Sequence, residues 1–124
     1  MVNTQGKLDA DPQIFLIDFG FADKFTEKDG KTHIDPTAST EMFQGNMLFS
    51  SVRQMEFRRT SRKDDLVALF YLMIYSLNDE SLFVGKENPM NGSHANINVV
   101  FNAIKNWKIK HDLGTIAELF AKEF

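Results

Sequence analysis

The segment that most restricts the fold is an apolar stretch of twelve residues, Leu66 to Leu77, which follows a short polar sequence. Ser61 is suited to be a helix N-cap, and Asp64 three residues later completes a capping-box-like pair. Carboxylates at Asp64 and Asp65 suit the positive end of the helix dipole. The pattern predicts a helix whose body is apolar on every face. We expect a helix of that kind in a soluble protein to be buried on all sides.

Shorter patterns predict further elements on both sides of this helix. Ile14 to Ile17 favours a buried strand, Phe21 to Phe25 favours a short second strand, and the polar residues 26–42 predict a long loop. Helices are expected at Ser51 to Phe57, from Ile97 to about Trp107, and around Ile116, Leu119 and Phe120. The sequence shows no β-α-β alternation. We therefore predict an α+β, mainly α fold in which a short strand pair precedes the helices.

Composition excludes several classes of protein. The chain of 124 residues has a formal net charge of −3, which is too small to indicate a nucleic-acid binder. It contains no cysteine, which excludes a disulfide scaffold and a thiolate zinc site. The N-terminus is polar and no apolar run is long enough for a bilayer, so neither a signal peptide nor a membrane span is predicted. We expect an intracellular protein, cytoplasmic or nuclear, with no nucleic-acid or membrane partner.

The tripeptide Asp18-Phe19-Gly20 directly follows the first predicted strand. A carboxylate at the end of a strand, with a glycine that allows a sharp turn, is well placed to hold Mg²⁺. The same three residues are also typical of an ordinary turn that ends a strand. The tripeptide alone leaves both interpretations open.

Three blocks together resemble the casein kinase I family of Ser/Thr protein kinases. They are LIDFGFADKF at 16–25, GNMLFSSVRQMEFRRTSRKDDLVALFYLMIYSLN at 45–78, and TIAELF at 115–120. The family typically has DFG-L-A-K-K-Y, then G-T-A-R-Y-A-S-I-N and S-R-R-D-D-L-x-S-L-x-Y. The resemblance covers nearly the whole chain and is weakest at 78–96. It implies a fragment of the kinase large lobe, from just after the catalytic loop to about helix G or H.

The resemblance divides residues 1–124 into a strand pair with Asp-Phe-Gly at 1–25, an activation segment at 26–60, and a helical part at 61–124. It implies that Asp18 binds the Mg²⁺ ion that positions the phosphates of ATP. Phe19 then links the two lobes and Gly20 permits the turn, so these three residues form the cofactor-binding set.

The resemblance also implies structural roles for Ser61 and Asp65 at the start of the central helix. In the family, the carboxylate at the position of Asp65 accepts hydrogen bonds from the backbone of the catalytic loop. We expect Asp65 to be buried here and to lack those partners.

Several parts of the kinase machinery cannot be found in these residues. Phosphoryl transfer needs a glycine-rich loop, a lysine paired with a helix glutamate, a catalytic Asp, and an Asn for a second metal. The sequence contains neither G-x-G-x-x-G nor H-x-D-x-x-x-x-N. We therefore expect no catalytic Asp in this chain, no tight binding of Mg²⁺ or ATP by the chain alone, and no catalysis. Leu48 and Asn46 replace the family's usual Arg and Thr, and Leu48 removes a cation that the family uses to hold phosphate or acidic groups.

A basic cluster has two interpretations, and it consists of Arg53, Arg58, Arg59, Arg62 and Lys63. The guanidinium groups are suited to contact an acidic or phosphorylated partner through bidentate hydrogen bonds. The alternative is a solvated layer of charge that is balanced by the aspartates at the start of the helix.

Two functions stay open. The first is a piece of a casein kinase I-like Ser/Thr kinase that acts on a protein substrate with ATP and Mg²⁺. The second is a kinase-derived, non-catalytic binding or regulatory module that docks on missing kinase segments or on another kinase. Because the central helix needs cover that this chain does not encode, we expect the isolated chain to be marginally stable, aggregation-prone or partnered.

Overall fold

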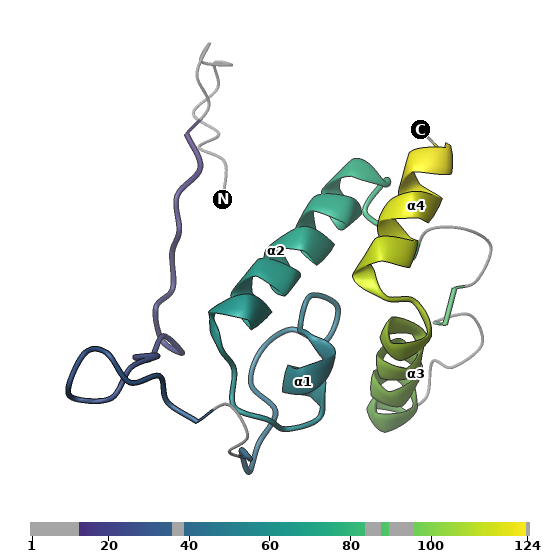
Figure 1. Ribbon diagram of the computed structural model, residues 1–124. Helices are drawn as coiled ribbons and strands as arrows, with labels where there is room; N and C mark the ends of the chain where they lie inside the picture. The colour runs from purple at the N-terminus through teal and green to yellow at the C-terminus, as the bar shows by residue number, and fades with distance from the viewer. Residues whose placement is uncertain (1–12, 36–38, 84–87, 90–95, 124) are drawn as a thin grey trace.

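A computed structural model of the chain describes residues 13–35, 39–83, 88–89 and 96–123. Its helices in these ranges are α1 (Val52–Met55), α2 (Arg62–Leu77), α3 (Ile97–Lys110) and α4 (Leu113–Glu123) (Figure 1). No strand longer than a single-residue bridge occurs in the same ranges. The prediction of a mainly helical fold is confirmed.

The predicted start of the central helix is confirmed in detail. The backbone N–H of Ser61, the N-cap of α2, donates to the carboxylate of Asp64 at 2.7 Å. The helix ends at Leu77, and the residues that follow Asn78 turn the chain. Asp79 and Glu80 both have left-handed backbone angles, with φ of 48° and 57°. This conformation is uncommon for residues other than glycine, and it reverses the chain direction directly after the helix.

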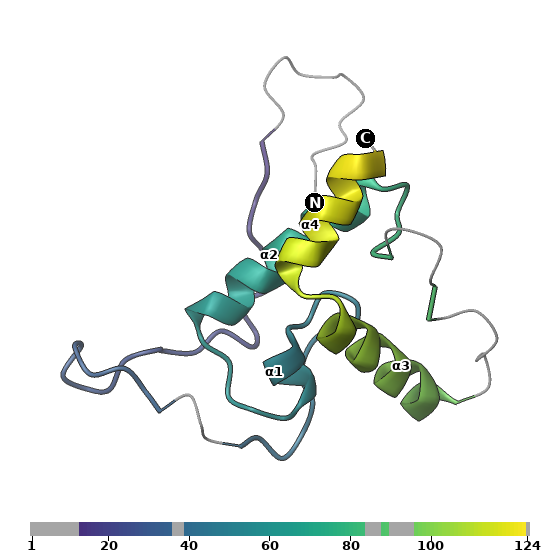
Figure 2. The same ribbon diagram turned by 45° about the vertical axis from the view of Figure 1, so that its right-hand side comes forward.

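The core lies between the helices. In both views α3 lies beside α1, and α4 lies near the C-terminal end of α2 (Figures 1 and 2). The rings of Phe83 and Trp107 meet edge to face, with centroids 5.0 Å apart, and join the segment after α2 to α3. The buried apolar residues are Met55, Tyr71, Ile74, Leu82, Phe83, Ile104, Trp107 and Ile116.

The predicted burial of α2 on every side is wrong. Tyr71 and Ile74 are buried, but Leu66 is 67% exposed and Met73 is 53% exposed. The described elements pack against one face of this helix, so its opposite face stays in contact with solvent.

None of the described helices combines the length and apolarity needed to cross a membrane.

The predicted strand pair is also wrong. Apart from a bridge at Ile14, residues 13–25 are extended chain or turn (Figure 1). Ile14 and Leu16 are more than four-fifths exposed, and Phe21 is three-quarters exposed. A strand needs a neighbour that satisfies its backbone N–H and C=O groups along its length. In the described residues the carbonyl of Phe25 accepts from the N–H of Ile34 at 2.9 Å, but no paired strand forms here. Residues 26–35 and 39–42 form the expected loop, in which Thr26 and His33 form an antiparallel bridge.

We predict different costs for the same substitution at two isoleucines of α3. Ile104 is fully buried and Ile109 is 55% exposed. Because deleting one buried methyl group leaves a small cavity, Ile104→Val should lower the free energy of unfolding by about 1 kcal/mol. Ile109→Val should change it by less than about 0.5 kcal/mol. Urea unfolding followed by far-UV circular dichroism measures both values, and equal costs would contradict this core.

Candidate functional site

The Asp-Phe-Gly tripeptide lies on the extended segment, outside the helical core. Asp18 has a left-handed backbone with φ of 62°, and its Oδ1 accepts a hydrogen bond from the N–H of Gly20 at 3.3 Å. The backbone N–H of Ala22 donates to the carbonyl of Phe19 at 3.0 Å. The predicted turn is therefore present. The carboxylate of Asp18 is exposed to solvent, and Phe19 is 66% exposed.

The side chains around Asp18 determine whether it can bind a metal ion. In the described part of the chain, no group of three or more His, Asp or Glu side chains could hold a metal. A single exposed carboxylate is not a metal site on its own. It does suit Mg²⁺ that is held by one or two carboxylates together with the phosphates of a nucleotide.

Asp64 joins the first two helices. Its Oδ1 accepts a hydrogen bond from the hydroxyl of Ser51 at 2.6 Å, and its Oδ2 accepts from the N–H of Ser61 at 2.7 Å. The Ser51 hydroxyl also accepts from the N–H of Gln54 at 3.1 Å and caps α1. One carboxylate, 3% exposed, therefore fixes the N-termini of both helices.

The expectation that Asp65 is the buried carboxylate is wrong, because Asp65 is exposed and its neighbour Asp64 is buried. Successive residues of a helix point about 100° apart, so adjacent aspartates face different surroundings. The third position of α2, held by Asp64, points back to Ser61 and toward the start of α1. The N-cap role predicted for Ser61 is confirmed.

The loop that resembles the family at 45–50 folds against α1. Gly45 has φ of 122°, and a side chain at this position would lie 2.6 Å from Gln54 Nε2. The amide of Gln54 donates to the carbonyl of Gln44, and the Ser50 hydroxyl donates to the carbonyl of Asn46. The backbone angle therefore favours glycine at residue 45, and a larger residue would also displace the end of the Gln54 side chain.

Lys108 on α3 holds the same loop from the other side. Its side chain is 2% exposed, and its Nζ donates to the carbonyls of Met47 at 2.9 Å and Ser50 at 2.6 Å. The same atom lies 3.8 Å from the sulfur of Met55 on α1 and 4.5 Å from the ring centroid of Tyr71 on α2. One cation thus connects the loop with three helices.

Burial shifts the pKa values of Lys108 and Tyr71 in opposite directions. Burial lowers the pKa of Lys108 from 10.5 to about 7, because the charged ammonium loses its hydration. Burial raises the pKa of Tyr71 from 10.0 to about 12, because the phenolate is the charged form.

The predicted basic cluster makes separate contacts within the chain. Arg58 pairs with Glu56 at 3.5 Å and Arg59 pairs with Asp23 at 3.3 Å. The guanidinium carbon of Arg62 lies 4.3 Å from the ring centroid of Phe25. Arg53 lies on α1 and also makes a contact within the chain. Because three of these cations already have an acidic or aromatic partner, a role in contacting an anionic partner stays a prediction.

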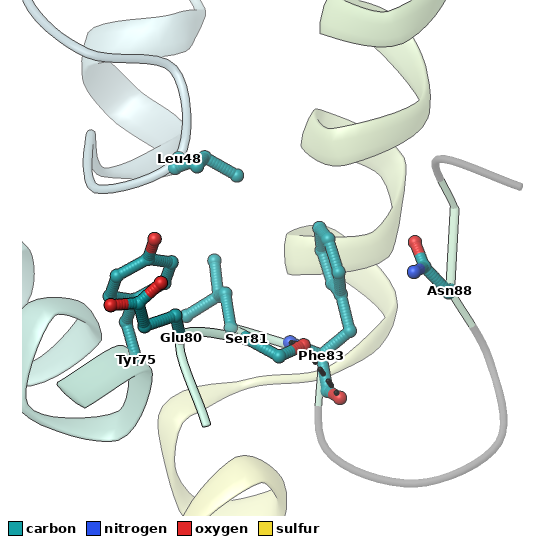
Figure 3. Close-up of a pocket in the computed structure, with 7 residues that line it drawn as sticks. Leu48, Tyr75, Glu80, Ser81, Phe83 and Asn88 are labelled. Carbon is teal, nitrogen blue, oxygen red and sulfur yellow. Dashed lines mark hydrogen bonds between the residues drawn. The ribbon is translucent and has the colours of Figure 1, made fainter. Parts of the chain in front are cut away.

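A pocket opens between the 45–50 loop and the segment after α2 (Figure 3). Its volume is about 220 Å³. Figure 3 shows Tyr75 and Glu80 on one side and Phe83 and Asn88 on the other, with Leu48 directed in from the loop. The lining residues are Leu48, Tyr75, Glu80, Ser81, Leu82, Phe83 and Asn88.

Comparison with known proteins finds that part of this chain is similar to casein kinases. Casein kinase 1-like protein HD16 of Oryza sativa subsp. japonica is 35% identical over 63 residues, which are 51% of this chain and 9% of that protein. Casein kinase I homolog 1 of Saccharomyces cerevisiae is 31% identical over 91 residues, which are 73% of this chain and 16% of that protein. Casein kinase I homolog 2 of the same yeast is 29% identical over 91 residues.

The chain is related to the casein kinase I family. The resemblance that the sequence motifs indicated is thereby confirmed. The matched region is at most 16% of the length of these relatives. No protein-family model matches the chain, and no solved structure matches it significantly.

Sequence reasoning missed the role of Lys108 and one of the two roles of Asp64. A signal for Lys108 was present, because it follows Phe101 and Ile104 at the spacing of one helix face. The expected end of that helix at Trp107 hid it, since α3 continues to Lys110. The sequence pattern identified Asp64 as a capping residue of α2. It carried no signal for the hydrogen bond to Ser51, because that bond joins residues thirteen positions apart.

We predict that the two adjacent aspartates differ in their effect on stability. Asp64→Asn should lower the free energy of unfolding by about 2 kcal/mol, because a charged acceptor of buried hydrogen bonds is lost. Asp65→Asn should lower it by less than about 1 kcal/mol, because only the interaction with the helix dipole weakens. Urea unfolding at neutral pH measures both variants. A larger cost at Asp65 would contradict the assignment of Asp64.

We also predict a pH dependence of stability that depends on Lys108. Between pH 7 and 10.5 the unfolded chain keeps the proton on this lysine while the folded chain releases it. The free energy of unfolding should therefore rise as the pH rises through this range. Tyr71 acts in the opposite direction above pH 10, because it keeps its proton in the folded state up to about pH 12. The useful window is thus pH 7 to 10.

The control for this prediction is a second lysine of α3. Lys108→Met should remove the rise between pH 7 and 10, and Lys105→Met, at a partly exposed position, should preserve it. Urea midpoints measured across this window compare the three proteins. An identical pH profile for the parent and Lys108→Met would contradict the prediction.

Proposed function

We propose that this chain forms part of the large lobe of a casein kinase I-like Ser/Thr kinase. The complete kinase transfers the γ-phosphoryl group of ATP to Ser or Thr of a protein substrate. Residues 26–60 are the activation segment of that lobe, and residues 61–124 are its helical part. One observation supports the proposal most. The block at 45–78 that resembles the family includes the loop and the helix starts that Lys108 and Asp64 hold in place.

Within this proposal, Asp18, Phe19 and Gly20 form the nucleotide side of the chain. The turn at Gly20 leaves the carboxylate of Asp18 open to solvent, where it can share Mg²⁺ with nucleotide phosphates. Phosphoryl transfer depends on positioning and on neutralising charge at the phosphates. Of the groups that position and neutralise the phosphates, these 124 residues supply the Asp18 carboxylate, and they lack the catalytic-loop pattern. The chain on its own is therefore inactive.

One observation favours a second candidate, a non-catalytic binding module. The core at residues 45–83 and 96–123 and its pocket do not involve Asp18. A protein that uses this unit alone needs neither nucleotide nor metal. Mass spectrometry of the native protein separates the candidates. A native species of 14.2 kDa supports the module, and finding only a much larger species excludes it.

We predict that the purified chain does not phosphorylate peptides. Incubation with radiolabelled ATP, Mg²⁺ and a Ser/Thr peptide should give no incorporation above background, because most of the electrostatic stabilisation is missing. Asp18→Asn and the matched loop variant Glu27→Gln should behave like the parent. Phosphorylation that Asp18→Asn abolishes and Glu27→Gln preserves would overturn the predicted inactivity.

The family assignment of the complete protein has a separate test. Sequencing the transcript upstream of Met1 should show an in-frame H-x-D-x-x-x-x-N pattern within a few codons. If no such pattern is present, the kinase proposal fails and the binding module stands.

A further inference from the structure

The pocket beside Leu48 combines apolar walls with one carboxylate. Leu48, Leu82 and Phe83 supply apolar surface, and Tyr75 supplies an aromatic ring with a hydroxyl group. The ring of Tyr75 is held by Phe49, whose centroid is 5.3 Å away in an edge-to-face contact. Leu82 is 1% exposed and Phe83 is 9% exposed, so the floor of the pocket belongs to the core.

Glu80 gives this pocket its charge. Its backbone lies in the left-handed region, and the turn of Asp79 and Glu80 places the carboxylate at the pocket (Figure 3). Among the described residues, Glu80 forms no ion pair. The side chain of Lys108 is not its partner, because the Nζ of Lys108 is buried and donates to the carbonyls of Met47 and Ser50.

We propose that this pocket binds the side chain of an arginine in a protein partner. A guanidinium group stacks on aromatic rings and donates in a fork to a carboxylate, and the pocket offers Tyr75, Phe83 and Glu80 for these contacts. A volume of about 220 Å³ suits one side chain. It is below the range of roughly 300–1,000 Å³ that is usual for pockets of small-molecule ligands.

Leu48 determines the sign of the charge that the pocket accepts. The resemblance places the family's usual Arg at this position, where it holds phosphate or acidic groups. With Leu48 and Glu80 together, the pocket carries an unpaired negative charge and repels such groups. The inference therefore deepens the proposed function, on which it rests for the choice of a protein partner, and gives this chain a preference for basic partners.

Fluorescence anisotropy with three labelled five-residue peptides tests the proposal. The peptides are identical except for a central arginine, citrulline or phosphoserine, and citrulline keeps the shape of arginine without its charge. The parent chain should bind the arginine peptide about two- to fivefold more tightly than the citrulline peptide, as expected for one exposed ion pair. The phosphoserine peptide should bind most weakly.

Three variants connect the preference with the pocket. Glu80→Gln should abolish the difference between arginine and citrulline, and the matched control Glu118→Gln, at an exposed position on α4, should keep it. Leu48→Arg should weaken binding of the arginine peptide and strengthen binding of the phosphoserine peptide. Circular dichroism verifies that each variant is folded. If a variant does not fold, the parent chain still tests the proposal, because its preference for arginine over citrulline should decrease as salt is added.

Equal affinity of the parent for the arginine and citrulline peptides would overturn the proposal. Tightest binding of phosphoserine, or an unchanged preference in folded Glu80→Gln, would do the same. None of these measurements uses ATP or the upstream sequence. A failure of the pocket is therefore distinguishable from a failure of the kinase assignment.

Discussion

A buried ammonium group holds the loop at 45–50 against three helices. Lys108 has almost no contact with water, and it replaces hydration by two carbonyl acceptors and the ring of Tyr71. Burying a cation is costly, so the arrangement is favourable only while these partners are in place. The loop cannot leave α3 without exposing unpaired groups on both sides. The wall of the pocket that Leu48 forms is therefore part of the core packing.

Asp64 is a second buried polar side chain that connects separate parts of the fold. It accepts hydrogen bonds from Ser51 and Ser61 and so fixes where α1 and α2 begin. Together the lysine and the aspartate hold the stretch of sequence that most resembles the casein kinase I family. This explains how the helical part forms a core even though the described residues 13–25, Asp18 among them, contribute none of its buried apolar residues.

The parts of the structure that were predicted correctly are local. The capping pair Ser61 and Asp64 marked the start of α2, and the spacing of apolar residues marked α3 and α4. The errors concern partners. The strands at Ile14–Ile17 and Phe21–Phe25 were predicted from composition, but a strand exists only where a neighbour completes its hydrogen bonds. The burial of α2 was predicted from its apolarity, but only one of its faces is covered by the described elements.

The sequence by itself determined the helices, the cap of α2 and the resemblance to the casein kinase I family, because these depend on residues within a few turns of one another or on motifs in a fixed order. The tertiary structure alone decided which of two adjacent aspartates is buried, what Lys108 contacts, and which side chains surround the pocket beside Leu48. Those features join residues that are distant in the chain. Their free energies depend on which groups exclude water from one another, and this is fixed only when the helices pack.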